Sequence, residues 1–305
     1  MDDLTRDFYE ERRHKWRRSA FWRGVLITLS VLVLLGVLVV ILGGGPRFAD
    51  HIAHVVLKGV IYNDPVLDAT LKDVEENDKA KALILTISSP GGTTVGSEAV
   101  FERLRKISDK KPVVSVLGEV AASGGYIAAI GADHIIARGN TITGSIGVIM
   151  EYPDLTDLLT KVGITMQTIR SSEIKGGPSP FRKSTPEARA AEKVLIDESY
   201  QWFRGLVEDR RGLNGSKLDT VADGRVFTGR LALDLGLIDA IGGFDEAIEY
   251  LDSLDSIEAK LPVDAYALEY ENVGLFGIVG KFLLRNGNLG RISGKSGPRL
   301  YSIAK

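Results

Sequence analysis

Short apolar segments alternate with helix-like segments between residues 51 and 137, and this alternation restricts the fold more than any other feature of the sequence. The segments "ALILTI" (82–87) and "PVVSVLG" (112–118) are almost wholly apolar, which is typical of strands buried on both faces. A helix-like segment near 95–107 separates them. The sequence therefore predicts an α/β fold in which a mostly parallel sheet is covered by helices.

Helix start signals refine this outline. Thr185 is a suitable N-cap and Pro186 a suitable first-turn residue for a long helix over 186–211. Pro65 marks the start of another helix within 64–77. The other predicted elements are strands at 51–62 and 133–137 and a helix of small residues at 123–131.

The segment 24–42 is uncharged over 19 residues. As a helix it would be about 28 Å long, close to the ~30 Å hydrocarbon core of a bilayer. Basic residues are concentrated before it, whereas only Arg47 follows before Lys58. A cleaved signal peptide is the alternative, but its apolar region should span only about 7–15 residues. We expect a retained anchor, with the N-terminus in the cytoplasm and the remaining chain on the extracytoplasmic (periplasmic) side.

These features predict five regions. They are a basic cytoplasmic N-terminus (1–23), a transmembrane anchor (24–42), a linker (43–51), a main folded domain (52–255) and a basic C-terminal tail (256–305). Residues 272–305 contain six Lys or Arg and no Asp or Glu, which is typical of a solvated tail or of a segment held near anionic lipid.

Composition excludes several classes of function. The formal net charge is −2, so no basic surface indicates nucleic acid binding. The chain has no cysteine, which rules out disulfides, thiolate nucleophiles, iron–sulfur clusters and structural zinc sites built on thiolates. We expect neither a metal nor a cofactor.

Ser123 is the first candidate nucleophile. It follows a predicted strand, opens a predicted helix and precedes Gly124 and Gly125. Unpaired N–H groups at a helix start can stabilise an oxyanion, so Gly124 is a candidate donor. The turn "SSPGG" (88–92) also ends a strand and begins a helix, and Gly91 is the candidate for the second donor. A serine before two glycines is more often only a helix cap, but two such strand ends together favour acyl transfer.

Residue types alone do not decide which residue would accept the proton of Ser123. The sequence contains only four histidines, His14, His51, His54 and His134, and none is well placed for a Ser–His–Asp triad. A lysine becomes a base when burial lowers its pKa. The lysines after the serine that we consider are Lys161, Lys175, Lys183 and Lys193. Lys175, on a glycine-flanked loop, is modestly favoured over Lys183.

Five motifs occur in an order that resembles signal peptide peptidase A, the SppA or protease IV family of membrane serine peptidases. The resemblance covers about residues 52–250 and is closest to the short, single-copy form. The motifs are "SPGG" (89–92), "ASGGYIAA" (122–129), "TGSIGV" (143–148), "EIKGGPSPFRKSTPEAR" (173–189) and "VADGRVFTGRLALDLGLIDAIGG" (221–243).

The resemblance implies a role for each matching residue. Ser123 would be the nucleophile, Lys175 the general base and Ser145 the residue that orients the lysine, while Gly91 and Gly124 would form the oxyanion hole. It also implies a ClpP/crotonase-type fold and a ring-like homo-oligomer in which serine and lysine come from neighbouring subunits. The expected activity is cleavage of remnant signal peptides and similar apolar, extended peptides. No family motif matches the region after 256.

Three other functions remain as alternatives. A crotonase-like acyl-transfer enzyme would need paired carboxylates, and only Glu119 is close in sequence. A Clp-type peptidase would need a histidine about two dozen residues after the serine, where "GSIGVIM" stands instead. A catalytically inactive membrane scaffold could keep the same fold, although the presence of both Ser123 and Lys175 disfavours it.

Overall fold

The computed structural model describes residues 21–35 and 49–268. The chain divides into two units, residues 1–50 and 51–305. In the first unit, residues 21–35 are helical and their side chains are exposed. Within the described ranges, no helix is both long and apolar enough to cross a membrane. Residues 36–42 of the predicted anchor lie outside those ranges, so the anchor stays a prediction.

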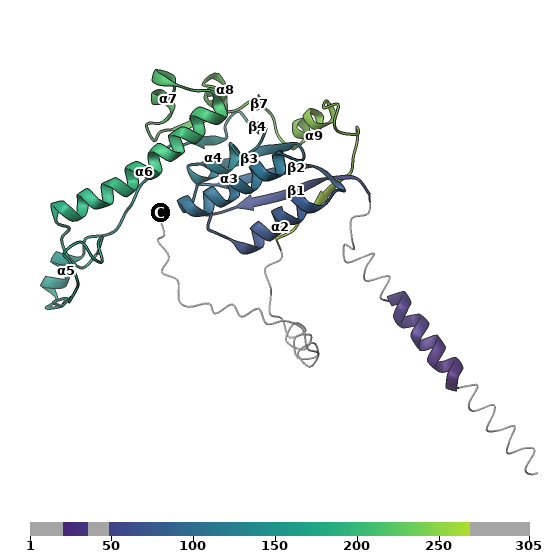
Figure 1. Cartoon of the computed structure of the whole chain (residues 1–305), viewed down its shortest axis with the longest axis horizontal. Helices are drawn as coiled ribbons and strands as arrows, with labels where there is room; N and C mark the ends of the chain where they lie inside the picture. The colour runs from purple at the N-terminus through teal and green to yellow at the C-terminus, as the bar shows by residue number, and fades with distance from the viewer. Residues whose placement is uncertain (1–20, 36–48, 269–305) are drawn as a thin grey trace, which may run out of the picture. The chain divides into compact units, whose positions relative to one another are not determined.

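The second unit is built on an eight-stranded sheet (Figure 1). Its path runs β6-β5-β3-β2-β1-β8, with β4 pairing with β3 and β7. All strand pairs are parallel except β5 with β6, which confirms the predicted mostly parallel α/β sheet. The strands are β1 (His51–Lys58), β2 (Ala80–Ser89), β3 (Val113–Ala122), β4 (His134–Ala137), β5 (Ile142–Gly144), β6 (Val226–Thr228), β7 (Ala240–Ile241) and β8 (Val263–Ala265).

The central strands are buried on both faces, as their apolar sequences predict. Along β2, Leu83 and Leu85 belong to one hydrophobic cluster, and Ala82 and Ile84 belong to another. Successive side chains of a strand point to opposite faces, so the two clusters lie on opposite sides of the sheet. Full burial of a leucine stabilises the fold by about 1.5–3 kcal/mol. This double burial fixes the ends of β2 and β3, where the candidate site lies.

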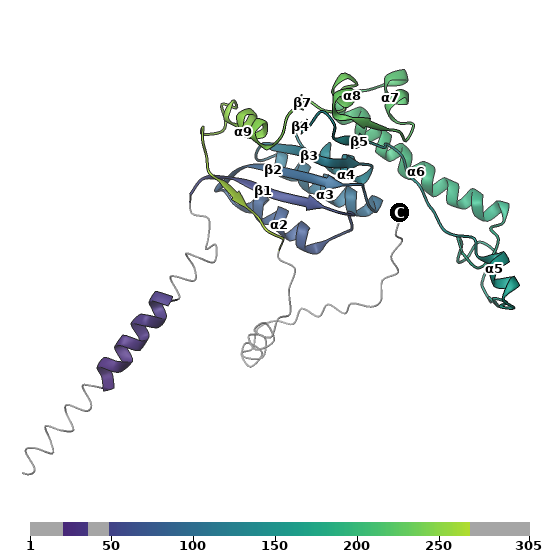
Figure 2. The same ribbon diagram turned by 180° about the vertical axis from the view of Figure 1, so that it is seen from behind.

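Helices cover both faces of the sheet (Figures 1 and 2). Side chains of α2 and α3 pack in the first cluster and those of α9 in the second. The helices of this unit are α2 (Pro65–Glu76), α3 (Thr94–Ser108), α4 (Gly124–Ala129), α5 (Thr156–Lys161), α6 (Pro186–Arg211), α7 (Gly215–Val221), α8 (Gly229–Asp234) and α9 (Phe244–Asp252). The predicted bounds of α6 are confirmed, and its N-cap Thr185 accepts a hydrogen bond from the Ala188 N–H at 3.2 Å.

The folded domain extends past the predicted boundary at residue 255. Strand β8 pairs with β1, from Ile52 opposite Val263 to His54 opposite Ala265. Tyr266 is buried, and its hydroxyl lies 3.0 Å from His51 Nε2. The sequence signal for β8 is weak because the strand has only three residues and lies at the edge of the sheet. The first part of the predicted tail is therefore part of the sheet.

Residues 149–195, which we call the arm, differ from the rest of this unit. Figures 1 and 2 show α6 extending from the sheet region, with α5 at the far end. Among the hydrophobic residues of the arm, only Ala188 is buried. The exposed large hydrophobic residues of the arm are Ile149, Met150, Tyr152, Leu158, Val162, Ile164, Met166, Ile169, Ile174, Phe181, Val194 and Leu195. So large an unpartnered apolar surface is typical of an interaction site.

Candidate active site

Ser123 lies at a sharp turn between β3 and α4. Its N–H donates to the Gly144 carbonyl at 2.8 Å, and its carbonyl accepts from the Tyr126 and Ile127 N–H groups at 2.9 and 3.0 Å. Tyr126 is fully buried and donates its hydroxyl proton to the Leu237 carbonyl at 2.8 Å. The backbone of Ser123 is thus held from both sides.

The backbone of Ser123 is strained, with φ 53° and ψ −120°. Such a conformation in a non-glycine residue costs of the order of 1–3 kcal/mol and is concentrated at functional sites. A serine on a strained strand-to-helix turn is also how hydrolases with a nucleophile elbow expose the hydroxyl. Ser123 occupies the N-cap position of α4, yet its side chain makes no capping hydrogen bond. The helix-cap explanation for this serine is therefore wrong.

The turn 89–92 lies directly against Ser123, and together they form the strand-end site. A Cβ atom placed on Gly91 would lie 3.0 Å from Ser123 Cβ and 3.1 Å from Gly124 N. A Cβ on Gly125 would lie 2.8 Å from the Ser89 carbonyl oxygen. Both glycines are thus required by close backbone approach. The contact arises because β2 and β3 are parallel neighbours, so that their carboxyl ends meet at one edge of the sheet.

A bulge in the sheet brings Ser123 to this position. Ile87 pairs with Leu117, but Ser89 pairs with Ala121, so β3 has two more residues than β2 between these pairs. Extra residues of this kind bend a strand and redirect the side chains that follow, and they often occur beside active sites.

The hydrogen bonds of the turn 89–92 bear on the choice of the second oxyanion donor. The Gly91 N–H already donates to the buried Ser89 Oγ at 3.1 Å. The next N–H, that of Gly92, and the N–H of Gly124 have no acceptor among the described residues. Gly92 N also lies 3.0 Å from the position that a Cβ on Gly124 would occupy, so the two backbones adjoin. Gly92 is therefore a further candidate for the second donor, for which the sequence motif favours Gly91.

The backbone of Ser145 lies close to that of Ser123. It follows Gly144, whose carbonyl accepts the Ser123 N–H, and its own N–H donates to the Arg225 carbonyl at 2.8 Å. Ser145 also has a positive φ, 53°, which is uncommon for a residue other than glycine. Its side chain is half-buried. The structure therefore groups Ser145 with the strand-end site.

Lys175 is not brought to Ser123 within one chain. It lies in the arm and its side chain is exposed. Its N–H donates to the Ser172 carbonyl at 3.2 Å, and its carbonyl accepts a hydrogen bond from Arg182 Nη2 at 3.3 Å. Lys183 lies 3.4 Å from Asp157, and Lys193 forms an ion pair with Asp197, so both face carboxylates in the arm.

The three described histidines also lie away from Ser123. His54 Nε2 lies 2.9 Å from Thr86 Oγ1 on β2, and His134 stacks on Tyr250 with ring centroids 3.8 Å apart. Burial lowers the pKa of His54 and of His134. His51 and His134 begin their strands, whereas Ser123 follows the end of β3. Parallel strands place beginnings and ends at opposite edges, which disfavours a Ser–His pair. His14 lies outside the described residues.

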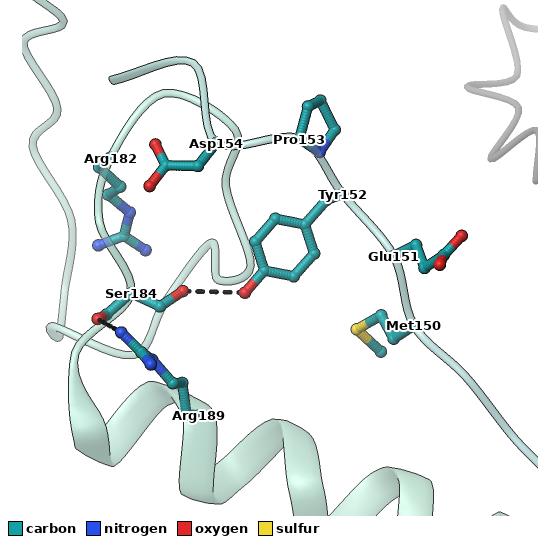
Figure 3. Close-up of a pocket in the computed structure, with 8 residues that line it drawn as sticks. All are labelled: Met150, Glu151, Tyr152, Pro153, Asp154, Arg182, Ser184 and Arg189. Atoms are coloured by element: carbon teal, nitrogen blue, oxygen red, sulfur yellow. Dashed lines mark hydrogen bonds between the residues drawn. The ribbon is translucent and has the colours of Figure 1, made fainter. Parts of the chain in front are cut away.

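The arm contains a pocket of about 740 Å³ that is separate from the strand-end site (Figure 3). Residues 150–154 line it on one side, and Arg182, Ser184 and Arg189 on the other. Within it, the hydroxyls of Tyr152 and Ser184 lie 3.0 Å apart, and Arg189 donates to the Ser184 carbonyl. Within the arm, these bonds join Tyr152 to Ser184 and Ser184 to the first turns of α6.

The crotonase alternative needs paired carboxylates at the site, and the one carboxylate close to Ser123 in the sequence gives it no support. Glu119 is exposed. Within residues 21–35 and 49–268, no group of three or more His, Asp or Glu side chains is placed to hold a metal ion.

One further polar residue that we did not predict adjoins the site. Ser97, on α3, is fully buried, and its Oγ would lie 2.2 Å from a Cβ placed on Gly124. Its position five residues after Gly92 was the only signal in the sequence.

Comparison with known proteins places this site in a family. The model for peptidase family S49 matches residues 105–258, half of the chain. A Synechocystis protein described as a protease is 42% identical over 188 residues, which are 62% of this chain and 68% of the relative. An Enterococcus faecium protein described as a signal peptide peptidase is 34% identical over 69% of this chain and 60% of its own.

A third relative is the chloroplastic serine protease SPPA of Arabidopsis thaliana, 37% identical over 58% of this chain. The match spans only 26% of that longer protein. The S49 match includes β3, Ser123 and the arm, and the relatives are described as proteases. The chain therefore belongs to peptidase family S49 and is a serine protease of that family.

Proposed function

We propose that this protein is a membrane-anchored serine endopeptidase that cleaves remnant signal peptides and similar apolar, extended peptides. The observation that carries the proposal is Ser123. Its backbone is strained, and its side chain makes no capping hydrogen bond to α4. The N–H groups of Gly92 and Gly124 lie nearby and have no acceptor among the described residues.

The mechanism begins with attack of Ser123 Oγ on the scissile carbonyl carbon. Lys175, as a neutral amine, takes the Oγ proton, and the carbonyl oxygen becomes the oxyanion, held by the N–H groups of Gly92 and Gly124. Collapse of the tetrahedral intermediate breaks the C–N bond, and the lysine returns the proton to the leaving amine. Water then hydrolyses the acyl-enzyme with the lysine again as base. Ser145 orients the lysine through a hydrogen bond.

Lys175 reaches Ser123 from a neighbouring subunit in this proposal. Two properties of the arm support this. Lys175 is exposed on a segment apart from the strand-end site, and twelve large hydrophobic side chains of the same arm are exposed. Burial of such a surface between subunits is favourable, and a head-to-tail contact that closes gives a ring. Each active site would then form at a subunit interface.

Within the α/β class, we propose that the fold is of the ClpP/crotonase type. The parallel sheet, the helices on both faces and the pairing of two strand ends at an oxyanion site support it.

Apolar peptides fit the surroundings of Ser123. Val60 and Tyr62 are exposed on either side of Ile61, which pairs with Gly92, and Val95 is exposed at the start of α3. Membrane anchoring by residues 24–42 would place the enzyme where cleaved signal peptides are released.

Hydrolysis of a fluorogenic, signal-peptide-like peptide tests the proposal. The purified full-length protein in detergent is compared with Ser123→Ala. Because loss of a serine nucleophile removes covalent catalysis, we expect kcat to fall by more than about 10³-fold. Equal cleavage by both proteins would assign the activity to another site. Absence of cleavage by an assembled wild type across several peptides would favour the inactive scaffold.

A further inference from the structure

Arg182 holds two backbone carbonyls of the arm with one guanidinium group, and the mechanism above does not use it. Its Nη1 donates to the Glu173 carbonyl and its Nη2 to the Lys175 carbonyl, each at 3.3 Å. The Arg182 side chain is half-buried. Arginine suits such a contact because its planar guanidinium presents several N–H donors in a fixed geometry. One side chain therefore grips the backbone of the proposed general base.

Residues 171–177, which we call the lysine loop, lie wholly within the described chain and form turns and bends rather than a helix or strand. The two backbone hydrogen bonds inside the loop each join residues three positions apart. The Glu173 carboxylate pairs with Arg170, again three positions away. Among hydrogen bonds within the described residues, only the two from Arg182 join the loop to a more distant part of the chain. Arg182 therefore limits how far the Lys175 backbone can move.

The segment that carries Arg182 is itself held on both sides. Two residues before Arg182, the Pro180 carbonyl accepts the Leu155 N–H at 2.8 Å. Two residues after it, the Ser184 hydroxyl lies 3.0 Å from the Tyr152 hydroxyl (Figure 3). Arg182 thus reaches the lysine loop from a segment that is fixed to another part of the arm.

We propose that Arg182 is a positioning residue, which holds the Lys175 backbone so that the lysine amine reaches Ser123 of the neighbouring subunit. To take the proton of Ser123, the amine must lie about 2.6–3.2 Å from the serine Oγ. A long side chain on a free loop meets this condition only part of the time, whereas a fixed backbone restricts where the side chain starts. In this role Arg182 neither touches the substrate nor transfers a proton. The inference rests on the proposed function.

Arg189 provides a matched control. It lines the same pocket as Arg182, and its Nη2 also donates to a backbone carbonyl at 3.3 Å, that of Ser184. Arg189→Ala removes the same atoms as Arg182→Ala but leaves both carbonyls of the lysine loop bonded. A second variant, Arg182→Lys, keeps the positive charge but loses the forked geometry that spans two carbonyls.

The first experiment measures kcat and KM for the fluorogenic peptide, together with oligomer size and unfolding temperature, in full-length assembled proteins. For Arg182→Ala we expect kcat to fall by roughly 10- to 100-fold with KM nearly unchanged, because a misplaced base slows the chemical step while the strand-end site is intact. Arg182→Lys should lie between Arg182→Ala and wild type, and Arg189→Ala should keep the wild-type kcat. Oligomer size and unfolding temperature should stay close to wild type in all three variants.

Mixed oligomers show which half of the active site Arg182 serves. Arg182→Ala is reassembled at equal concentration with Ser123→Ala in one sample and with Lys175→Ala in another. The first mixture should recover about one quarter of the wild-type rate, since an intact lysine loop meets an intact serine in that fraction of interfaces. The second should reach only about half the rate of Arg182→Ala alone, because no chain in it has both Arg182 and Lys175.

A wild-type kcat in Arg182→Ala would overturn the assignment, as would an equal loss in Arg189→Ala or a loss that accompanies dissociation of the oligomer. Recovery beside Lys175→Ala but not beside Ser123→Ala would place Arg182 on the serine side and also contradict it. If wild type does not cleave the peptide, if Ser123→Ala or Lys175→Ala cleaves normally, or if these two variants do not complement each other, the proposed function itself fails.

Discussion

The strand-end site and the arm differ in how firmly one chain holds their residues. At the strand-end site, hydrogen bonds and close contacts fix Ser123, Gly91 and Gly124 within one chain. In the arm, Lys175 and most of the large apolar side chains around it are exposed. The proposed nucleophile and oxyanion donors are thus positioned by the protein core, whereas nothing in the part of one chain that the structure describes positions the proposed base beside that nucleophile.

This difference suggests how activity is controlled. A serine with nearby backbone donors but no base is a poor nucleophile, because its hydroxyl stays protonated at neutral pH. If the base arrives only with a neighbouring arm, a single chain is inactive, and assembly switches on peptide cleavage. The predictions below test each half of the comparison.

Gly124→Ala tests how tightly the strand-end site is fixed. The new methyl group would lie 2.2 Å from Ser97 Oγ and 3.0 Å from Gly92 N, so one of the two must move. We expect kcat to fall by about 10²-fold, because displacement of one oxyanion donor has that effect. Steady-state kinetics of the full-length protein measure it.

Gly131→Ala is the control for Gly124→Ala. Its methyl group would lie 3.1 Å from the Ala128 carbonyl oxygen and from Leu104 Cβ, so the contacts would be tight. Gly131 itself lies after the end of α4. We expect some loss of stability and a kcat close to wild type. Equal losses of kcat in the two variants would mean that α4 packing, not the oxyanion donors, limits activity.

Ile169→Asp tests the arm as an assembly surface. Ile169 has a relative exposure of 104%, so the single chain gains nothing from its burial. The free energy of unfolding should change by no more than about 0.5 kcal/mol, as for other surface substitutions. A charge in an apolar subunit contact should instead shift the protein to smaller oligomers, with activity falling about tenfold.

Light scattering coupled to size-exclusion chromatography measures the size of the oligomer. Leu231→Asp is the control, because Leu231 is 51% exposed on α8, outside the arm. Assembly and activity should be retained there. Wild-type assembly of Ile169→Asp would show that this part of the arm lies outside the subunit contact.

The smallest expected effect concerns pH and His54. Burial lowers the pKa of His54 below its ordinary value of 6.5, so the unfolded chain binds a proton more readily than the folded one. Stability is therefore greatest above that value and decreases as pH falls through it. His54→Gln should reduce the decrease in unfolding temperature between about pH 7.5 and 5.5. An unchanged slope would mean that His54 does not contribute to it.

Local sequence patterns predicted the fold around Ser123 well. The apolar runs in β2 and β3 gave the parallel central strands, and Thr185 with Pro186 gave the start of α6. The contact between Ser123 and the turn 89–92 follows from two parallel strands that end at one edge. These features depend on short-range periodicity and capping, which a sequence records directly.

Other features depend on three-dimensional contacts that no local pattern records. Gly91 and Gly92 are identical residues, and only the Ser89 hydroxyl decides which N–H remains available. Ser97 meets Gly124 across two helices that are distant in sequence. Strand β8 is defined by its partner β1 rather than by its own residues. The exposure of Lys175 likewise follows from the course of the arm.

The central claim is that the nucleophile and the base come from different chains. The most direct test is to mix purified Ser123→Ala with Lys175→Ala, each inactive alone, after dissociation and reassembly at equal concentrations. We expect peptide cleavage to return to about one quarter of the wild-type rate, since random head-to-tail neighbours place an intact Ser123 beside an intact Lys175 in that fraction of interfaces. A mixture that reassembles fully and stays inactive would contradict the claim, because it would mean that both residues must come from the same chain.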